Sequence, residues 1–199
     1  IHDSTSTLDD LSTIFSDLTD YGDELNTYGD TLDYNLEEAN TQRKLVFPLS
    51  VLYEDAHLAI IHKPAGILVS GNGFKTITHA LPQNLQQSPL ADATKPQPVH
   101  RLDYATTGAL LIGKTSSTIR VLNELFENKT ISKTYFAVTI GEMQTQGIIT
   151  NEVDSKESKS SYNVLAKLNS DRFGKLNLVQ LNPHTGRRHQ LRIHLASIG

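Results

Sequence analysis

The chain has 199 residues, enough for one ordinary domain with a sizeable core and a terminal extension. It contains no cysteine, which excludes disulfides and cysteine-based metal or thiol chemistry. Its formal net charge is −4, and no segment has the apolar length of a membrane span or the pattern of a signal peptide. We therefore expect a soluble, cytoplasmic protein without a membrane partner.

The net charge conceals two oppositely charged regions. Residues 1–40 hold 11 acidic residues and no lysine or arginine, whereas residues 41–199 hold the other 11 acids and all 18 basic residues. We expect an acidic N-terminal leader, residues 1–42, followed by a basic domain, residues 43–199. A basic domain suits contacts with phosphate groups, although its excess charge alone equally fits a solvated surface that has no partner.

The leader contains one segment with helical periodicity. Its apolar residues Leu8, Leu11, Phe15 and Leu18 recur at the spacing of a helix face. Acidic, tyrosine and glycine residues alternate after this segment, but their spacing does not match an EF-hand calcium loop. We expect a short helix that packs on the domain, and we hypothesise that the acidic leader covers the basic face of the domain in cis.

The domain begins with two predicted strands, over residues 49–54 and 58–63, separated by a polar turn. A Lys-Pro-Ala-Gly turn follows, and then a helix of one or two turns over residues 76–81. The glutamine-, asparagine- and proline-rich residues 82–98 favour a loop. Beyond them, the apolar run 109–112 has the length of a buried strand.

The second part of the domain begins with a helix that Ser116 or Ser117 can cap and that ends near Glu127. Four strands are then predicted, over residues 131–141, 147–153, 162–168 and 176–181. Polar connections separate the last three of these strands, and the spacing of these three indicates an antiparallel meander.

The last segment combines basic residues with regularly spaced histidines. Thr185 can cap a final helix in which Arg188 and Arg192, four residues apart, share one face. The histidines recur every five residues, whereas two metal ligands on one helix face are four apart, so no metal site is expected. Together the elements predict the α+β class, with a mixed, mainly antiparallel central sheet and flanking helices and loops.

The most informative segment surrounds Asp103. It reads His100-Arg101-Leu102-Asp103, followed by a Thr-Thr-Gly break and the apolar run 109–112. This pattern places a single carboxylate on a loop at the edge of a core strand, where a rigid support can hold a reacting group. The alternative is that Asp103 only caps a turn beside Arg101.

This segment resembles the Arg-Leu-Asp motif of the RluA-like pseudouridine synthases, with Thr107 where the family usually has serine. Three further segments match the family in the same order: Lys63-Pro64-Ala65-Gly66, Lys133-x-Tyr135-x-Ala137, and Thr185-Gly186-Arg187-x-His189-Gln190 followed by Arg192 and His194. The resemblance covers roughly residues 46–199. Because family members continue past the final helix, it implies a catalytic domain that is incomplete at its C-terminus.

The resemblance implies an isomerase that converts a specific uridine of ribosomal or transfer RNA to pseudouridine, as a monomer and without metal or cofactor. Asp103 would attack C1′ of the ribose or abstract a sugar proton, and Arg192 would pair with it and keep it ionised. Tyr135 would stack on the uracil, and Arg101 would fill the space left by the flipped base. Lys63 would contact a phosphate or simply cap its strand end. Further substrate-binding candidates are His100, Arg187, Arg188, His189 and Gln190.

Two alternative functions fit parts of the sequence. A non-catalytic RNA-binding module would keep the same fold, and RNA affinity without isomerisation would identify it. A hydrolase would use Asp103 with His100 or His189, but it would need a nucleophile or a metal that the sequence does not supply.

Overall fold

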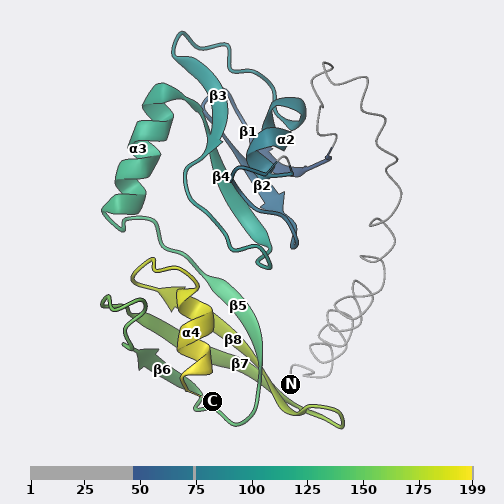
Figure 1. Ribbon diagram of the computed structural model, residues 1–199, viewed down its shortest axis with the longest axis vertical. Coiled ribbons are helices and arrows are strands. Elements are labelled where there is room, and N and C mark those ends of the chain that lie inside the picture. Colours follow the sequence, from purple (N-terminus) through teal and green to yellow (C-terminus); the bar gives the residue numbers. More distant parts are fainter. Residues whose placement is uncertain (1–46, 74, 199) are drawn as a thin grey trace, which may run out of the picture. The chain divides into compact units, whose positions relative to one another are not determined.

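The part of the chain that the structure describes contains two four-stranded antiparallel sheets and three helices (Figure 1). The structure is a computed structural model that describes residues 47–73 and 75–198, all of which belong to one compact unit. The predicted acidic leader and its helix, within residues 1–42, lie outside the described residues. The first sheet comprises, in spatial order, β1 (Ser50–Glu54), β2 (Leu58–Lys63), β4 (Gly108–Thr115) and β3 (Ala93–Pro98). The second comprises β5 (Tyr135–Ile140), β8 (Gly174–Pro183), β7 (Ser160–Ser170) and β6 (Gln146–Ile149).

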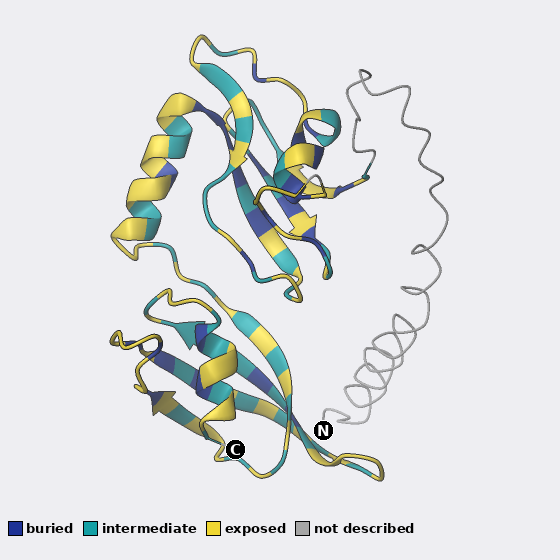
Figure 2. Ribbon diagram, in the orientation of Figure 1, coloured by how far each residue is buried: buried dark blue, intermediate teal, exposed yellow. Residues whose placement is uncertain are grey.

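The first sheet forms around the alternating side chains of its central strands. Ala59, Ile61 and Lys63 of β2 are buried, and Ile61 lies opposite Leu110 of β4 in the antiparallel register. Helix α2 (Ile77–Asn84) contributes three residues to the same buried cluster, so it covers the apolar side of the sheet. Figure 2 shows these buried positions in dark blue on β2, β4 and α2. The predicted strands and the short helix are therefore confirmed, and the helix ends three residues later than expected.

Helix α3 (Ser116–Glu127) follows β4 directly. Its cap is Thr115, whose hydroxyl accepts a hydrogen bond from the backbone N–H of Thr118, so the prediction of Ser116 or Ser117 as the cap was wrong by one position. The helix runs close to β4. A Cβ atom added at Gly113 would lie only 2.4 Å from Cγ1 of Ile119 in the helix. A side chain at position 113 would therefore push α3 away from the sheet.

The predicted loop over residues 82–98 was partly wrong. Helix α2 extends to Asn84, and residues 93–98 form strand β3. The sequence Lys95-Pro96-Gln97-Pro98 favours a loop because proline cannot donate to a strand ladder. β3 is an edge strand with an irregular register, in which Gln97 lies opposite Gly113 of β4, and an edge tolerates the missing donors.

The second sheet buries less of its surface. Its buried cluster consists of Ile149, Tyr162, Val179 and Leu181, which face α4 (Gln190–Ala196) and its partly buried leucines. The predicted antiparallel meander is confirmed for β6, β7 and β8, whereas β5 pairs with β8 at the edge of the sheet and begins at Tyr135 rather than at residue 131. The α+β class is also confirmed, with the strands divided between two sheets.

Helix α4 begins one turn later than the sequence suggested. Its N-cap residue is His189, which has the left-handed dihedral angles φ 53° and ψ 20°. Thr185 therefore does not cap the helix, and Arg188 precedes it, so Arg188 and Arg192 do not share a helix face. Within residues 47–73 and 75–198, no helix is long and apolar enough to cross a membrane.

Candidate active site

A buried lysine holds the loop that carries Asp103. The Lys63 ammonium is fully buried and donates to three backbone carbonyl oxygens: Pro64 at 2.9 Å, Tyr104 at 3.2 Å and Thr106 at 2.8 Å. Since an ammonium has three protons and no acceptor, these bonds use its full donor capacity. Burial lowers the pKa of Lys63, and the negative charge of Asp103 partly opposes that change. The lysine thus ties the end of β2 to the loop before β4.

This geometry decides between the two roles considered for Lys63. The side chain is inaccessible to solvent and already saturated with hydrogen bonds, so it is not placed to contact an RNA phosphate. The prediction of a substrate contact was wrong at this position. Only the strand-capping role fits, because the loop carbonyls are its partners.

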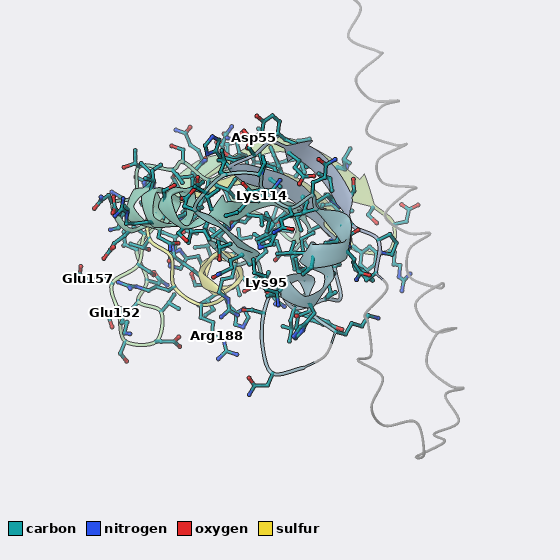
Figure 3. The ribbon with its side chains drawn as sticks, turned by 90° about the horizontal axis from the view of Figure 1, so that it is seen from above. Asp55, Lys95, Lys114, Glu152, Glu157 and Arg188 are labelled. Atoms are coloured by element: carbon teal, nitrogen blue, oxygen red, sulfur yellow. The ribbon has the colours of Figure 1, made fainter. Side chains whose placement is uncertain are left out.

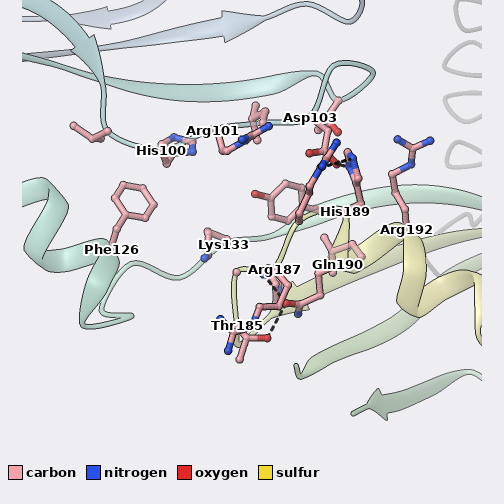
Figure 4. A pocket seen from close by; sticks show the side chains of 18 residues that line it. His100, Arg101, Asp103, Phe126, Lys133, Thr185, Arg187, His189, Gln190 and Arg192 are labelled. Atoms are coloured by element: carbon pink, nitrogen blue, oxygen red, sulfur yellow. Dashed lines mark hydrogen bonds and ion pairs between the residues drawn. The ribbon is translucent and has the colours of Figure 1, made fainter. Parts of the chain in front are cut away.

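The carboxylate of Asp103 lies at a cavity of about 500 Å³, within the range of small-molecule sites (Figure 4). Its wall combines the loop after β3, the start of β5, and the segment that leads into α4. Among the described residues that line it, Asp103 is the only acid. Five lysine or arginine residues share the wall: Arg101, Lys133, Arg187, Arg188 and Arg192. The cavity therefore offers one carboxylate in a positively charged surround.

The hydrogen-bond partner of Asp103 is His189. Nδ1 of His189 lies 2.7 Å from Oδ2 of Asp103, and both side chains are partly exposed (Figure 4). The sequence predicted that Arg192 would pair with Asp103. In the described residues this ion pair is not formed, and Arg192 is exposed on α4. The pairing was misassigned because His189, immediately before α4, occupies the position next to the carboxylate.

Tyr135 connects the two sheets. It begins β5, is half-buried, and packs against the cores of both sheets. Burial, and secondarily the charge of Asp103, raises the pKa of its phenol above 10.0, so the hydroxyl stays protonated at neutral pH. The ring lines the same cavity as Asp103, which fits the predicted position of an aromatic group beside the reacting base.

His100 has a structural environment. Its Nε2 accepts a hydrogen bond from the backbone N–H of Leu111 at 3.0 Å, and its ring stacks on Phe126 with centroids 4.8 Å apart. Burial lowers its pKa below 6.5, which favours the neutral ring that this hydrogen bond requires. Although His100 lines the cavity, its contacts fix the loop to β4 and α3 and do not support its predicted role in binding substrate.

Gln190 is another predicted substrate contact that the structure places in the interior. Its amide oxygen accepts from the Thr185 hydroxyl at 2.7 Å and the Arg187 backbone N–H at 3.0 Å. Its amide nitrogen donates to the carbonyl of Lys159 at 3.0 Å and the hydroxyl of Ser160 at 2.8 Å. Because the side chain is buried and all its bonds are internal, Gln190 anchors the loop and is not placed to bind RNA.

The remaining basic candidates lie on the cavity surface. Arg101 is exposed, and Arg187 is exposed with its Nε donating to the carbonyl of Glu157 at 3.1 Å. Arg188 is exposed at the surface of the molecule (Figure 3), and its Nε donates to Nε2 of His189 at 3.3 Å. Lys133 also lines the wall and was missed as a site residue, although its position two residues before Tyr135 was visible in the sequence.

The other two histidines of the final segment lie apart from Asp103. His194 is buried and its Nε2 contacts the hydroxyl of Ser158 at 2.6 Å, while His184 contacts the hydroxyl of Ser161 at 3.1 Å. His184 therefore contacts β7, and His194 contacts the segment just before it. Across residues 47–73 and 75–198, no three histidine or acidic residues form a group that could hold a metal ion.

A two-sheet α+β fold with one carboxylate in a basic cavity suits an enzyme that acts on a polyanion. The chain belongs to the RNA pseudouridylate synthase family, whose sequence model matches residues 57–197. This match spans both sheets and includes Asp103, Tyr135 and His189. The resemblance to the RluA-like members seen in the sequence is thereby confirmed.

Individual relatives agree with this assignment. The chain is 32% identical over 180 residues to ribosomal large subunit pseudouridine synthase D of Nitrosomonas europaea, covering 82% of the chain and 50% of that protein. It is 35% identical over 159 residues to ribosomal large subunit pseudouridine synthase C of Vibrio vulnificus, covering 72% and 48%. The chain thus spans about half the length of these curated relatives.

A solved structure shares the fold. Human RNA pseudouridylate synthase domain containing 4 superposes with a TM-score of 0.60 at 27% identity, over 74% of this chain and 64% of that one. The chain therefore shares its fold with this pseudouridylate synthase domain, which agrees with the match to the sequence model.

Proposed function

We propose that this domain is an RNA pseudouridine synthase that takes one uridine of a structured RNA into the cavity beside Asp103 and returns it as pseudouridine. The observation that carries the proposal is the setting of Asp103, the single acid on a cavity wall that holds five lysine or arginine side chains. Such a surround attracts the phosphate backbone, and the carboxylate supplies the chemistry. The enzyme would act as a monomer in the cytoplasm.

The reaction needs one carboxylate and no redox partner. The bond from C1′ to N1 of the uracil breaks, the base rotates, and a bond forms from C1′ to C5. The C5 proton leaves and N1 gains a proton, so the reaction is an isomerisation without change of oxidation state. Asp103 would begin it by attacking C1′ or by removing a ribose proton.

The other cavity residues would bind and hold the base. Tyr135 presents an aromatic ring on which the uracil can stack, a contact that contributes about 1–3 kcal/mol for a base on a protein ring. The target nucleotide must leave its own stack, at a cost of a few kcal/mol, and exposed Arg101 would occupy the vacated space. Arg187, Arg188 and Arg192 would contact phosphates and position the backbone.

We propose ribosomal RNA as the substrate class, because the named relatives act on the large ribosomal subunit. Transfer RNA is the second candidate. Both are folded RNAs in which shape and unpaired loops carry recognition, and a cavity with a basic wall fits such a target.

The test is the substitution Asp103→Asn in cells that lack the endogenous gene. We expect wild type to create pseudouridine at one or a few positions, mapped at base resolution across ribosomal and transfer RNA. Asp103→Asn should lose the product by more than about a thousandfold. It should retain RNA affinity at low salt, because the basic residues are unchanged. Asp171→Asn, an exposed residue in the β7–β8 turn, is the matched control and should remain active.

Two results would contradict the proposal. Measurable turnover by Asp103→Asn would remove the aspartate from the chemistry. Soluble wild-type protein that binds RNA but creates no pseudouridine in any ribosomal or transfer RNA would indicate a non-catalytic RNA-binding module.

A further inference from the structure

The segment before α4 places the imidazole of His189 next to the carboxylate of Asp103. His189 lies 86 positions after Asp103 in the chain, and its Nδ1 is 2.7 Å from Oδ2. Among the described residues, this is the only side chain that forms a hydrogen bond with the carboxylate. The contact engages Oδ2, so Oδ1 would remain available to the ribose of a bound nucleotide.

The backbone at His189 is held in an unusual conformation. Its φ of 53° lies in the left-handed region, which non-glycine residues rarely adopt and which persists only where neighbouring contacts impose it. The neighbouring residue supplies those contacts, because Gln190 forms four hydrogen bonds that fix the turn to β7 and to the Thr185 loop. The strained backbone therefore serves to direct the imidazole at Asp103.

The proton on this imidazole is also fixed. The Arg188 guanidinium donates to Nε2 of His189 at 3.3 Å, and a guanidinium has no acceptor atom. Nε2 must therefore be unprotonated, so the neutral ring carries its proton on Nδ1 and donates it to Asp103. Arg188 thus donates to His189, and His189 donates to the carboxylate of Asp103, which accepts.

We propose that His189 is the positioning residue of Asp103 and that Arg188 sets its tautomer. This inference rests on the proposed function, and it assigns to these two residues a role beyond the substrate contact expected from the sequence. The hydrogen bond holds one carboxylate oxygen so that the other faces C1′ or the ribose proton. Its loss frees the rotation of the carboxylate and slows the chemical step, while RNA binding is unchanged.

The first test needs no RNA. Nitrogen-15 spectra of the histidine rings in the whole chain, assigned by comparison with His189→Gly, report which ring nitrogen carries the proton. We expect the Nδ1–H form for His189 in wild type and a mixture of the two tautomers in Arg188→Ala. A dominant Nε2–H form in wild type would overturn the proposal, whether or not the protein is an enzyme.

The second test measures turnover on large-subunit ribosomal RNA transcribed in vitro. His189→Gly keeps the left-handed backbone without strain and removes the ring, so folding and the hydrogen bond are separated. We expect kcat to fall about 10- to 100-fold, the usual worth of a hydrogen bond to a charged group, with KM within about twofold of wild type. Because the site is partly exposed, free imidazole added to this variant should restore part of kcat.

The control is His57→Gly, the same substitution at an exposed histidine in the β1–β2 turn. Its kcat should equal that of wild type and should not respond to imidazole. Unchanged kcat in His189→Gly, or a loss that imidazole does not restore, would overturn the positioning role. A wild type without any turnover would count against the proposed function, and the tautomer spectra would still decide the inference.

Discussion

The two sheets contribute to the same cavity but differ in how firmly they are packed. Twelve buried hydrophobic residues form the core of the first sheet, whereas four form that of the second. The first sheet and its loop carry Asp103. The second sheet carries Tyr135 and, through the loop after β8, His189. The proposed reacting group thus lies on the better packed half, and the side chains proposed to orient it and its substrate lie on the half with the smaller core.

One face of the second sheet also exposes apolar side chains on its edge strand β5. Phe136, Val138 and Ile140 of β5 are exposed to 63%, 44% and 57%. Because burial of apolar area is the main stabilising contribution, a segment with few buried contacts opens more readily than a well-packed one. The comparison teaches that the distance from Asp103 to His189 depends more on the integrity of the second sheet than on that of the first.

The largest expected effect on stability comes from truncating one buried leucine in each core. Leu110→Ala in β4 should lower the free energy of unfolding by about 3–5 kcal/mol and Leu181→Ala in β8 by about 2–3 kcal/mol, since both leucines are fully buried but the first has more apolar neighbours. Urea unfolding measures the loss of stability in each variant, and hydrogen exchange measures the protection of the individual strands. Leu52→Ala, at a position 58% exposed, should change stability by less than about 0.5 kcal/mol.

Equal costs for Leu110→Ala and Leu181→Ala would break the comparison. So would hydrogen exchange in which β7 and β8 are protected as strongly as β2 and β4, because the smaller core would then be no weaker.

The next largest effect concerns Lys63, which fixes the Asp103 loop to the first sheet. Lys63→Met removes a buried cation and leaves three loop carbonyls without their donor, so stability should fall by about 2–4 kcal/mol and turnover should fall with it. Thermal unfolding and the pseudouridine assay measure the two losses. Lys175→Met is the matched control: Lys175 is exposed and paired with Glu142, and its loss should cost less than about 0.5 kcal/mol. Wild-type activity in Lys63→Met would show that the loop keeps its shape unaided.

The smallest effect concerns the acid stability of the first sheet. Burial lowers the pKa of His100 in the folded protein, so on acidification the unfolded chain binds the proton first. The stability that the neutral ring contributes is therefore present above about pH 6.5 and is lost as the pH falls through the lower folded value. His100→Gln keeps an acceptor for Leu111 and should flatten this dependence between pH 7 and pH 5. An equally steep profile in His100→Gln would assign the acid sensitivity to other groups.

Much of the fold follows from local patterns in the sequence. Residues 58–63 alternate clearly enough to be recognised as a strand, and the apolar run before Gly113 identifies β4. Strand β3 could not be recognised, because its prolines are tolerated only at a sheet edge and edge position depends on tertiary pairing. The left-handed residue before α4 was equally invisible, since no sequence rule places a histidine there.

The candidate site was predictable in its chemistry and less so in its contacts. Asp103 and Tyr135 were identified by motif and do line one cavity. The burial of Lys63 and Gln190 was missed, because polar residues are mostly exposed and only the tertiary fold shows that their partners are backbone atoms. The partner of Asp103 was misassigned to Arg192 because a pairing between residues 86 or more positions apart depends on how the two sheets meet.

The bonds from Lys63 have a consequence for how this loop can vary between proteins. Its ammonium donates hydrogen bonds to the backbone carbonyl oxygens of Pro64, Tyr104 and Thr106. These oxygens are present whatever side chains the three positions carry. Exposed Tyr104 and Ala105, and the hydroxyl-bearing Thr107, are therefore free to diversify while the curve of the chain is retained. One lysine therefore maintains the loop shape that presents the carboxylate, whatever side chains its neighbours carry.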